Sequence, residues 1–274
     1  MALEPLHVPS LLKRFGIRPK KSLGQNFLAD HNTLLKIVGD AQVAPSDHVL
    51  EIGAGLGNLT RILATHAEHV TAIEIDDHLY PALETVLTSF DNVRLVKGDI
   101  LTLPMESLFS EDGYLVVANI PYYITSAVIR HLLEAVVKPQ RIVLTMQREV
   151  AERILTRDEK MSLLSLSVQV YGKARIASHI PAGSFYPPPK VDSSVLVIEV
   201  YDQPQLSGAE IHQLFSLAHA AFNQKRKMLR NSLKPILGES LNTYLETAEI
   251  DSSHRPEDLS LEDWIRLVKA VTKT

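Results

Sequence analysis

The sequence predicts an α/β fold in which a mostly parallel seven-stranded sheet carries helices on both faces and a small all-helical domain follows. Short apolar runs alternate with amphipathic segments before Gln203-Pro204, and this alternation is typical of parallel strands linked by crossover helices. Beyond Pro204 the apolar spacing is helical, with no convincing strand. We therefore predict one domain over residues 1–202 and a helical domain over residues 203–274.

The composition is that of a soluble globular protein. With 274 residues, 45% of them hydrophobic and 22% charged, the chain can form one large domain and a small one. Its apolar runs fall short of the ~18–20 residues of a membrane span, and its N-terminus lacks the pattern of a secretory signal. The sequence contains no cysteine, which excludes thiolate chemistry. The histidines lack metal-ligand spacing, so we predict no metal site and expect a cytoplasmic protein.

The elements of the sheet domain follow a basic, weakly periodic segment of 29 residues. Asp30 has the chemistry of a helix N-cap, and the helix that it starts ends before Pro45. The apolar runs that predict strands are 48–52, 70–73, 93–96, 115–118, 142–146 and 191–200. We expect residues 173–180 to pair antiparallel with the last of these at the sheet edge. Residues 161–170 fit helix or strand, and we predict a helix.

The C-terminal domain is predicted to contain four helices. They cover residues 211–222, 224–234, 241–247 and 261–271. Ser260 and Asp263 have the spacing of a capping box at the start of the last helix.

Positive charge gathers in two segments although the formal net charge is −4. Basic residues without acids occupy one stretch between Pro5 and Ala29 and another between Ala221 and Pro235, whereas acids gather between Glu239 and Asp263. Such segregation favours an oriented anionic partner, with a solvated basic face as the alternative.

A Gly-rich turn, EIGAGLGN at residues 51–58, joins the first strand to a helix. Its glycines allow a sharp turn and close approach to a ligand, as dinucleotide sites also require. Glu74 ends the second strand, where an acid bonds ribose hydroxyls, and Asp99 follows the third, where an acid could meet an adenine amino group. Each acid alone could be a helix cap or a surface ion pair. Together these features predict a site for an adenosine moiety, as in NAD or S-adenosylmethionine.

The run NIPYY at residues 119–123 lies between an apolar strand and an amphipathic helix that we expect to begin at Ser126 and to bury Val136. It therefore falls at the strand ends where open α/β sheets bind ligands. An asparagine and nearby backbone carbonyls offer acceptors to an amino group, and tyrosines offer flat faces to a planar ring. A plain turn is the alternative for this run alone. Hydride transfer has no use for such an element, and the glycine pattern is G-x-G-x-G, so both observations favour S-adenosylmethionine over NAD.

Six motifs together resemble the bacterial small-subunit ribosomal RNA adenine dimethyltransferases, the KsgA/RsmA family. They are GQNFL (24–28), EIGAGLGNLT (51–60), GDIL (98–101), NIPYYIT (119–125), FYPPPKVDS (185–193) and AFNQKRKMLRNSL (221–233). The match spans nearly the whole chain. The resemblance implies a Rossmann-like class I S-adenosylmethionine-dependent methyltransferase that dimethylates the exocyclic amines of two adjacent adenosines in the 3′-terminal hairpin of small-subunit rRNA.

The resemblance also implies roles for individual residues. The cofactor would be surrounded by Asn26, Leu28, Gly53, Gly55, Glu74, Asp99 and Asn119. The basic N-terminal segment of residues 1–29 would complete this cofactor site. At the reacting amine, the Asn119 side chain and the Ile120 carbonyl would accept hydrogen bonds, Pro121 would fix the turn, and Tyr122 and Phe185 would hold an extruded adenine. The family's fourth motif usually has leucine where Ile120 stands, a change of little weight because the acceptor is the backbone. For Phe185 the alternative is packing of the proline turn that follows it.

The expected partner is small-subunit rRNA in the assembling 30S subunit, bound by a monomer. The residues expected to meet RNA phosphates are Lys190, Lys225, Arg226, Lys227, Arg230 and Lys234. Two alternatives remain: a large-subunit rRNA adenine methyltransferase of the macrolide-resistance type, and an assembly factor whose binding matters more than its catalysis.

Overall fold

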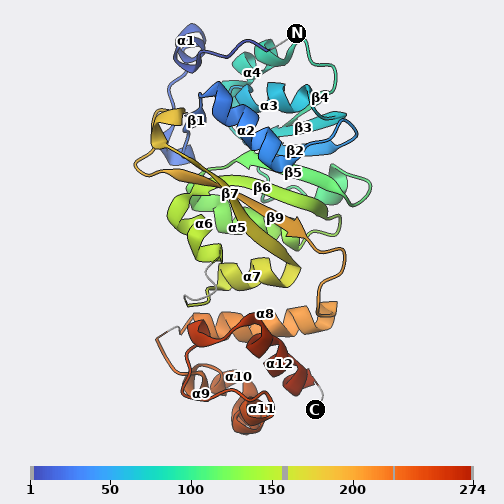
Figure 1. Cartoon of the computed structure of the whole chain (residues 1–274), viewed down its shortest axis with the longest axis vertical. Coiled ribbons are helices and arrows are strands. Elements are labelled where there is room, and N and C mark those ends of the chain that lie inside the picture. Colours follow the sequence, from blue (N-terminus) through green and yellow to red (C-terminus); the bar gives the residue numbers. More distant parts are fainter. Residues whose placement is uncertain (1–2, 156–159, 225, 273–274) are drawn as a thin grey trace. The chain divides into compact units, whose positions relative to one another are not determined.

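The computed structural model describes residues 3–155, 160–224 and 226–272. The chain divides into two compact units, one built from residues 1–152 and 174–200 and the other from residues 153–173 and 201–274. Figure 1 shows the course of the chain. Among the described residues, none of the helices is both long and apolar enough to cross a membrane.

A seven-stranded sheet forms the centre of the first unit. Its strands, in spatial order, are β4 (Val93–Lys97), β3 (His69–Glu74), β2 (His48–Ile52), β5 (Tyr114–Asn119), β6 (Pro139–Gln147), β9 (Ser193–Val200) and β7 (Gly172–Ile180). The pairs among the first five strands are parallel, and β9 runs antiparallel to β6. This arrangement confirms the predicted mostly parallel seven-stranded sheet, with β7 at its edge beside β9.

Helices cover both faces of the sheet because its central strands bury both sets of alternating side chains. Val117 and Val143 belong to a core cluster with residues of α2 (His31–Ala41), α3 (Asn58–Ala64) and α4 (Tyr80–Leu87). Val116 and Leu144 point to the opposite face and are equally buried. Helix α5 (Thr125–Leu133) contacts β6 and buries its own apolar stripe. The predicted cap of α2 is confirmed, since the Asp30 side chain accepts a hydrogen bond from the Thr33 amide.

Helix α5 differs from its prediction at both ends. It begins at Thr125 directly after the 3-10 turn of residues 122–124, so Ser126 lies inside the helix and caps nothing. It ends at Leu133, and Val136 beyond it is 78% exposed. The prediction that the helix buries Val136 was wrong because the helical spacing of apolar residues continues in the sequence beyond Leu133, where the helix ends.

The basic N-terminal segment contains a helix that the weak periodicity did not predict. Helix α1 (Val8–Arg14) buries Val8 and Leu12 in a small core with Phe27. Farther along, β1 (Phe27–Leu28) pairs antiparallel with β8 (Phe185–Tyr186), joining segments far apart in the sequence (Figure 1). The short 3-10 helices in the described ranges are Lys21–Leu23, Asp77–Leu79, Met105–Ser107, Tyr122–Ile124, Ala182–Ser184, Gly238–Ser240 and Pro256–Asp258.

The second unit is helical. Its helices are α7 (Leu163–Tyr171), α8 (Gly208–Phe222), α9 (Leu229–Ser232), α10 (Lys234–Leu237), α11 (Leu241–Thr247) and α12 (Leu261–Thr272). The first boundary between the two units along the chain falls within α6 (Arg148–Leu155). Trp264 of α12 is fully buried, and its ring stacks on Phe222 with centroids 6.0 Å apart. The capping box of Ser260 and Asp263 is present as predicted.

Residues 153–173 belong to the helical unit, whereas the sequence placed them in the first domain. Tyr171 of α7 stacks on Phe215 of α8 at 6.3 Å, and the Tyr171 carbonyl accepts a hydrogen bond from the Tyr201 amide. The chain therefore enters the helical unit, returns to the sheet through β7 and β9, and enters it again after Val200. Local hydrophobic periodicity does not show which of the two units a helix packs in, so the sequence could not predict this path of the chain.

The predicted helix over 224–234 is wrong. Helix α8 ends at Phe222, and α9 and α10 are separate single turns. The amides of Leu229 and Arg230 donate to carbonyls of residues 254 and 252 instead of continuing a helix. Pro235 lies in the first turn of α10, which begins at Lys234, and it could not lie inside a longer helix because proline lacks the amide that a helix interior requires.

Candidate functional site

A pocket of about 360 Å³ opens at the carboxyl ends of the parallel strands. Its walls come from the turns after β2, β3, β4 and β5 and from the N-terminal residues 23–27. Of the residues predicted for the cofactor and the reacting amine, those that line it are Asn26, Gly53, Gly55, Glu74, Asp99, Asn119, Ile120, Pro121 and Tyr122. Residues from five separate stretches of sequence thus meet in one cavity.

The Gly-rich turn after β2 needs glycine for two reasons. Gly53, Gly55 and Gly57 have φ of 78°, 61° and 82°, the left-handed region that other residues rarely adopt. A Cβ on Gly55 would also lie 3.2 Å from the Phe27 ring. The turn therefore presents bare backbone to the pocket and lets the N-terminal segment close against it.

Glu74 is fixed at the end of β3 by three backbone amides. Its Oε2 accepts from Gly55 at 2.8 Å, and its Oε1 accepts from Ile75 at 2.9 Å and Asp76 at 2.8 Å. Burial raises the pKa of Glu74, and these hydrogen bonds oppose the rise. The carboxylate is thereby held in place, with lone pairs that can accept hydroxyl hydrogens from a sugar.

Asp99 and two isoleucines form the part of the pocket beyond Glu74. One Asp99 oxygen accepts from the Leu101 amide at 3.0 Å. Ile75 and Ile100, each directly after one of the two acids, also line the pocket. A carboxylate between apolar side chains suits a flat heterocycle with an exocyclic amine. Neither isoleucine was predicted as a site residue, although the position of each directly after a strand-end acid was a usable signal.

A hydrogen-bonded network ties the N-terminal segment to the turn after β3. Buried Asp76 accepts from Lys20 Nζ and from Gln25 Nε2, each at 2.7 Å. The Gln25 Oε1 accepts from the Lys20 amide at 2.7 Å. Burial alone would raise the pKa of Asp76, but the bonds from Lys20 and Gln25 lower it overall. This network holds residues 23–27 as a wall of the pocket. The resemblance implied that the N-terminal segment completes the cofactor site, but the bonds from Lys20 and Gln25 to Asp76 were not predicted.

The orientation of the Asn119 carboxamide follows from its contact with that wall. Asn119 Nδ2 donates to the Asn26 carbonyl at 3.2 Å, so its Oδ1 is left as an acceptor. Asn119 and the next residue, Ile120, both line the pocket. Within the described part of the chain, the Ile120 carbonyl has no hydrogen-bond donor. Two acceptors thus stand side by side at the end of β5.

Tyr122 and the turn before it are also fixed by long-range contacts. The Tyr122 hydroxyl lies 2.8 Å from the hydroxyl of Ser193, which is fully buried at the start of β9. A Cβ on Gly24 would lie 3.0 Å from Pro121 Cβ, so glycine is needed where the N-terminal segment meets the turn. Tyr123 also lines the pocket, although its side chain is 66% exposed.

Two predicted site residues do not line the pocket. Phe185 is only 4% exposed and lies in the core of the first unit, where it pairs with Leu28 across β1 and β8. Leu28 is also buried in that core, and its carbonyl accepts from Asn58 Nδ2 at 3.0 Å. Side chains alternate along a strand, so the exposed neighbour on β8 is Tyr186. The structure therefore places Phe185 in the core of the first unit and not at the pocket.

Glu51 lies beneath the Gly-rich turn and is buried. Burial raises its pKa to about 8. Its Oε2 and the Asn58 Oδ1 have no hydrogen-bond partner among the described residues. Both residues line a cavity of about 30 Å³ that also touches Gly53 and Asn119. Two unsatisfied buried oxygens beside the larger pocket suit a ligand's cationic group.

The predicted RNA-binding residues lie at the surface. Arg226, Lys227, Arg230 and Lys234 are exposed in the second unit, and Lys190 is exposed in the first. Lys225 lies outside the described residues. Lys20, in the N-terminal basic segment, is already paired with Asp76.

The family model for ribosomal RNA adenine dimethylases matches residues 16–273. The chain belongs to the ribosomal RNA adenine dimethylase family. The match covers both units, including the proline-rich and basic segments on which the resemblance was based.

Curated relatives of this dimethylase-family chain are similar over nearly their whole length. A protein named ribosomal RNA small subunit methyltransferase A from Dehalococcoides mccartyi (strain CBDB1) is 42% identical over 94% of this chain and 90% of its own. The protein of the same name from Bacillus pumilus (strain SAFR-032) is 38% identical over 98% and 97%.

Two solved structures are similar in fold to this dimethylase. The 23S rRNA methyltransferase ErmE has a TM-score of 0.72 and 28% identity over 90% of this chain and 100% of its own. A dimethyladenosine transferase from Plasmodium falciparum has a TM-score of 0.75 and 26% identity over 90% and 98%. Both support the methyltransferase fold.

The pocket of this dimethylase fits S-adenosylmethionine, its methyl donor. Glu74 stands where ribose hydroxyls would be bound, Asp99 with its flanking isoleucines suits adenine, and the unsatisfied oxygen of Glu51 suits an ammonium. The glycines of the Gly-rich turn, which have positive φ and no side chain, leave room for the part of the cofactor that joins its ribose to its ammonium group.

Proposed function

We propose that this protein transfers methyl groups from S-adenosylmethionine to the exocyclic amines of two adjacent adenosines in the 3′-terminal hairpin of small-subunit rRNA. The observation that carries this proposal is the pair of acceptors at the end of β5. The Asn119 Oδ1, oriented by the bond to Asn26, and the free Ile120 carbonyl belong to the same pocket as the cofactor residues.

The chemistry requires a nucleophilic amine rather than a metal or a covalent intermediate. When bound, the cofactor supplies a methyl group activated by its sulfonium. The adenine amine is a poor nucleophile because its lone pair is delocalised into the ring. Hydrogen bonds from the amine to Asn119 Oδ1 and the Ile120 carbonyl favour a pyramidal nitrogen whose lone pair points at the methyl carbon. They also stabilise the positive charge that develops on nitrogen. The proton leaves after transfer.

Tyr122 is the residue that we propose stacks on the extruded adenine. Enzymes that act on bases typically extrude them at a cost of a few kcal/mol, and base–aromatic stacking returns about 1–3 kcal/mol. The bond to buried Ser193 holds the Tyr122 hydroxyl in place and so restrains the direction of the side chain. Burial raises the pKa of Tyr122, so its hydroxyl stays protonated and able to make that bond.

The small subunit is the proposed target because both curated relatives reported above are named for it, at about 40% identity over more than nine-tenths of this chain. The large subunit is the second candidate, favoured by the fold similarity to ErmE. We further propose that the protein acts as a monomer on assembling 30S subunits in the cytoplasm. Arg226, Lys227, Arg230, Lys234 and Lys190, all exposed, would meet RNA phosphates.

The test is methyl transfer to purified subunits that lack the modification. The protein is incubated with radiolabelled S-adenosylmethionine and either 30S or 50S subunits, and the methylated nucleotides are mapped by nuclease digestion and mass spectrometry. We expect N6,N6-dimethyladenosine at two adjacent positions near the 3′ end of the 30S rRNA. Label only in 50S rRNA would favour the second candidate, and label in neither would contradict both.

A further inference from the structure

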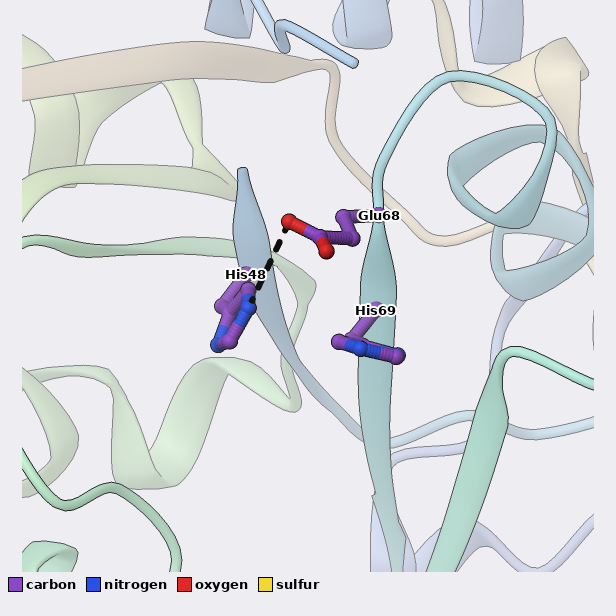
Figure 2. Close-up of side chains that lie close together, drawn as sticks. All are labelled: His48, Glu68 and His69. Atoms are coloured by element: carbon purple, nitrogen blue, oxygen red, sulfur yellow. Dashed lines mark ion pairs between the residues drawn. The ribbon is translucent and has the colours of Figure 1, made fainter. Parts of the chain in front are cut away.

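Three potential metal ligands lie together at the end of the sheet opposite the cofactor pocket. His48 is the first residue of β2, His69 is the first residue of β3, and Glu68 directly precedes it. Figure 2 shows the three side chains gathered where the two strands begin. The pocket residues lie at the other ends of the same strands, five or six residues away, which is about 15–20 Å of strand.

The backbone fixes this arrangement. His48 and His69 are direct partners in the parallel pair of β2 and β3, so both rings project from the same side of the sheet. The Asp47 carbonyl accepts from the amides of Glu68 at 3.0 Å and His69 at 3.4 Å, which anchors the start of β3 to the residue before β2. The cluster is therefore set by sheet register rather than by flexible loops.

The side chains are close enough to share one ion after small rotations. The two imidazole centroids are 5.0 Å apart with their planes at 76°, and His48 Nε2 lies 3.8 Å from Glu68 Oε2. One ligand atom from each of the three residues lies within 4.8 Å of the others. His48 and His69 also line a groove of about 520 Å³ that is open to solvent, which gives an ion a path of entry.

The donor set selects the class of ion. Two imidazole nitrogens and one carboxylate oxygen suit zinc and the neighbouring divalent transition metals, whereas calcium and magnesium prefer oxygen alone. Three protein ligands leave further coordination positions to water. We propose that His48, Glu68 and His69 bind one divalent transition-metal ion of the zinc class and tie the first residues of β2 and β3 together.

The test uses untagged full-length protein that has been treated with EDTA and desalted. Zinc chloride is titrated into the protein in a calorimeter, and thermal unfolding is followed with and without zinc. We expect one zinc per chain and a higher unfolding temperature with zinc, because an ion that binds only the folded state stabilises it. His48→Ala and His69→Ala should each weaken binding by about tenfold or more, and Glu68→Gln should weaken it as well.

His254→Ala is the matched control, since His254 is exposed in the helical unit and should leave the titration unchanged. A cooperative unfolding transition in EDTA shows whether each variant is folded. If an alanine variant is not folded, His48→Gln or His69→Gln is titrated in its place. Zinc affinity that is unchanged in the His48 and His69 variants, or no stoichiometric binding by the native chain, would overturn the proposal. Neither readout depends on methyl transfer.

Discussion

Asn119 is the residue on which the proposed chemistry depends most directly. Its amide nitrogen is engaged by the Asn26 carbonyl, which leaves the oxygen to accept from the substrate amine. Removing one such preorganised group typically lowers turnover by about 10²–10³-fold. In the proposed role, the Asn119 Nδ2 anchors the side chain to the N-terminal segment and the Oδ1 accepts a hydrogen bond from the substrate amine.

Asn119→Ala should lower the rate of methyl transfer to 30S subunits by at least about 100-fold while cofactor binding survives in weakened form. Single-turnover rates with labelled cofactor measure the first effect, and calorimetric titration with S-adenosylhomocysteine measures the second. Asn32→Ala is the matched comparison because Asn32 is exposed on α2 and is not among the residues that line the pocket. Near-normal transfer by the Asn119 variant would contradict the proposed role.

Glu51 gives the folded chain a predictable dependence on pH. Its pKa is about 8 in the folded state against an ordinary value of 4.5, so between these values the folded state holds a proton that the unfolded state has lost. Stability is therefore lost as pH rises through this window, by on the order of 1 kcal/mol per pH unit.

Glu51→Gln should remove this loss. In the absence of cofactor, the free energy of unfolding of the native chain should fall relative to that of the variant from about pH 5 to pH 8. Urea unfolding at a series of pH values measures the difference. Glu84→Gln, which alters an exposed glutamate of α4, should keep the native dependence. Parallel curves for the native chain and the Glu51 variant would show that Glu51 titrates normally.

At the scale of elements, the N-terminal segment is part of the cofactor site because Asp76 holds it there. Asp76 is buried and satisfied by Lys20 and Gln25. Loss of the lysine would leave a buried carboxylate without its cation, which costs more than the pair contributes when intact. Residues 23–27 would then sample positions away from the pocket.

Lys20→Met should raise the KM for S-adenosylmethionine by about tenfold, which corresponds to roughly 1.4 kcal/mol, with a smaller effect on kcat at saturating cofactor. The neighbouring Lys21→Met is the matched control, because Lys21 is exposed at the surface. Steady-state kinetics over a range of cofactor concentrations separate the two parameters. Equal KM values for both variants would rule out the Lys20–Asp76 pair as the anchor of this wall.

At the scale of the whole molecule, the charge pattern agrees with an anionic partner despite the net charge of −4. The second unit exposes the side chains of Arg226 and Lys227, which lie beyond the end of α8. Contacts of this kind supply affinity that depends on salt, because each neutralised phosphate releases counterions.

Arg226→Gln/Lys227→Gln should bind 30S subunits more weakly, and the log–log slope of affinity against salt should become shallower by about 0.7–0.9 for each lost contact. Filter binding at several salt concentrations measures the slope. The control Lys36→Gln/Arg94→Gln removes the same amount of charge from exposed positions of the first unit. This control should keep the salt slope of the native chain. An unchanged slope in the first variant would place the RNA contacts elsewhere.

The sequence by itself determined the sheet and most of the candidate cofactor pocket. Parallel strands buried on both faces are continuous apolar runs, and the residues at their carboxyl ends necessarily meet at one edge. Glu74, Asp99 and Asn119 could therefore be assigned to one site from their positions after three strands, and the structure gathers them around one pocket.

Only the tertiary structure decided the features that depend on contacts between distant segments. Phe185 is in the core because β8 pairs with β1, and residues 153–173 join the helical unit because α7 packs on α8. Lys20 is anchored to Asp76, and His48 meets His69, through contacts that no local spacing records. Periodicity reports which side of an element is buried, whereas strand register and packing decide which residues lie against it.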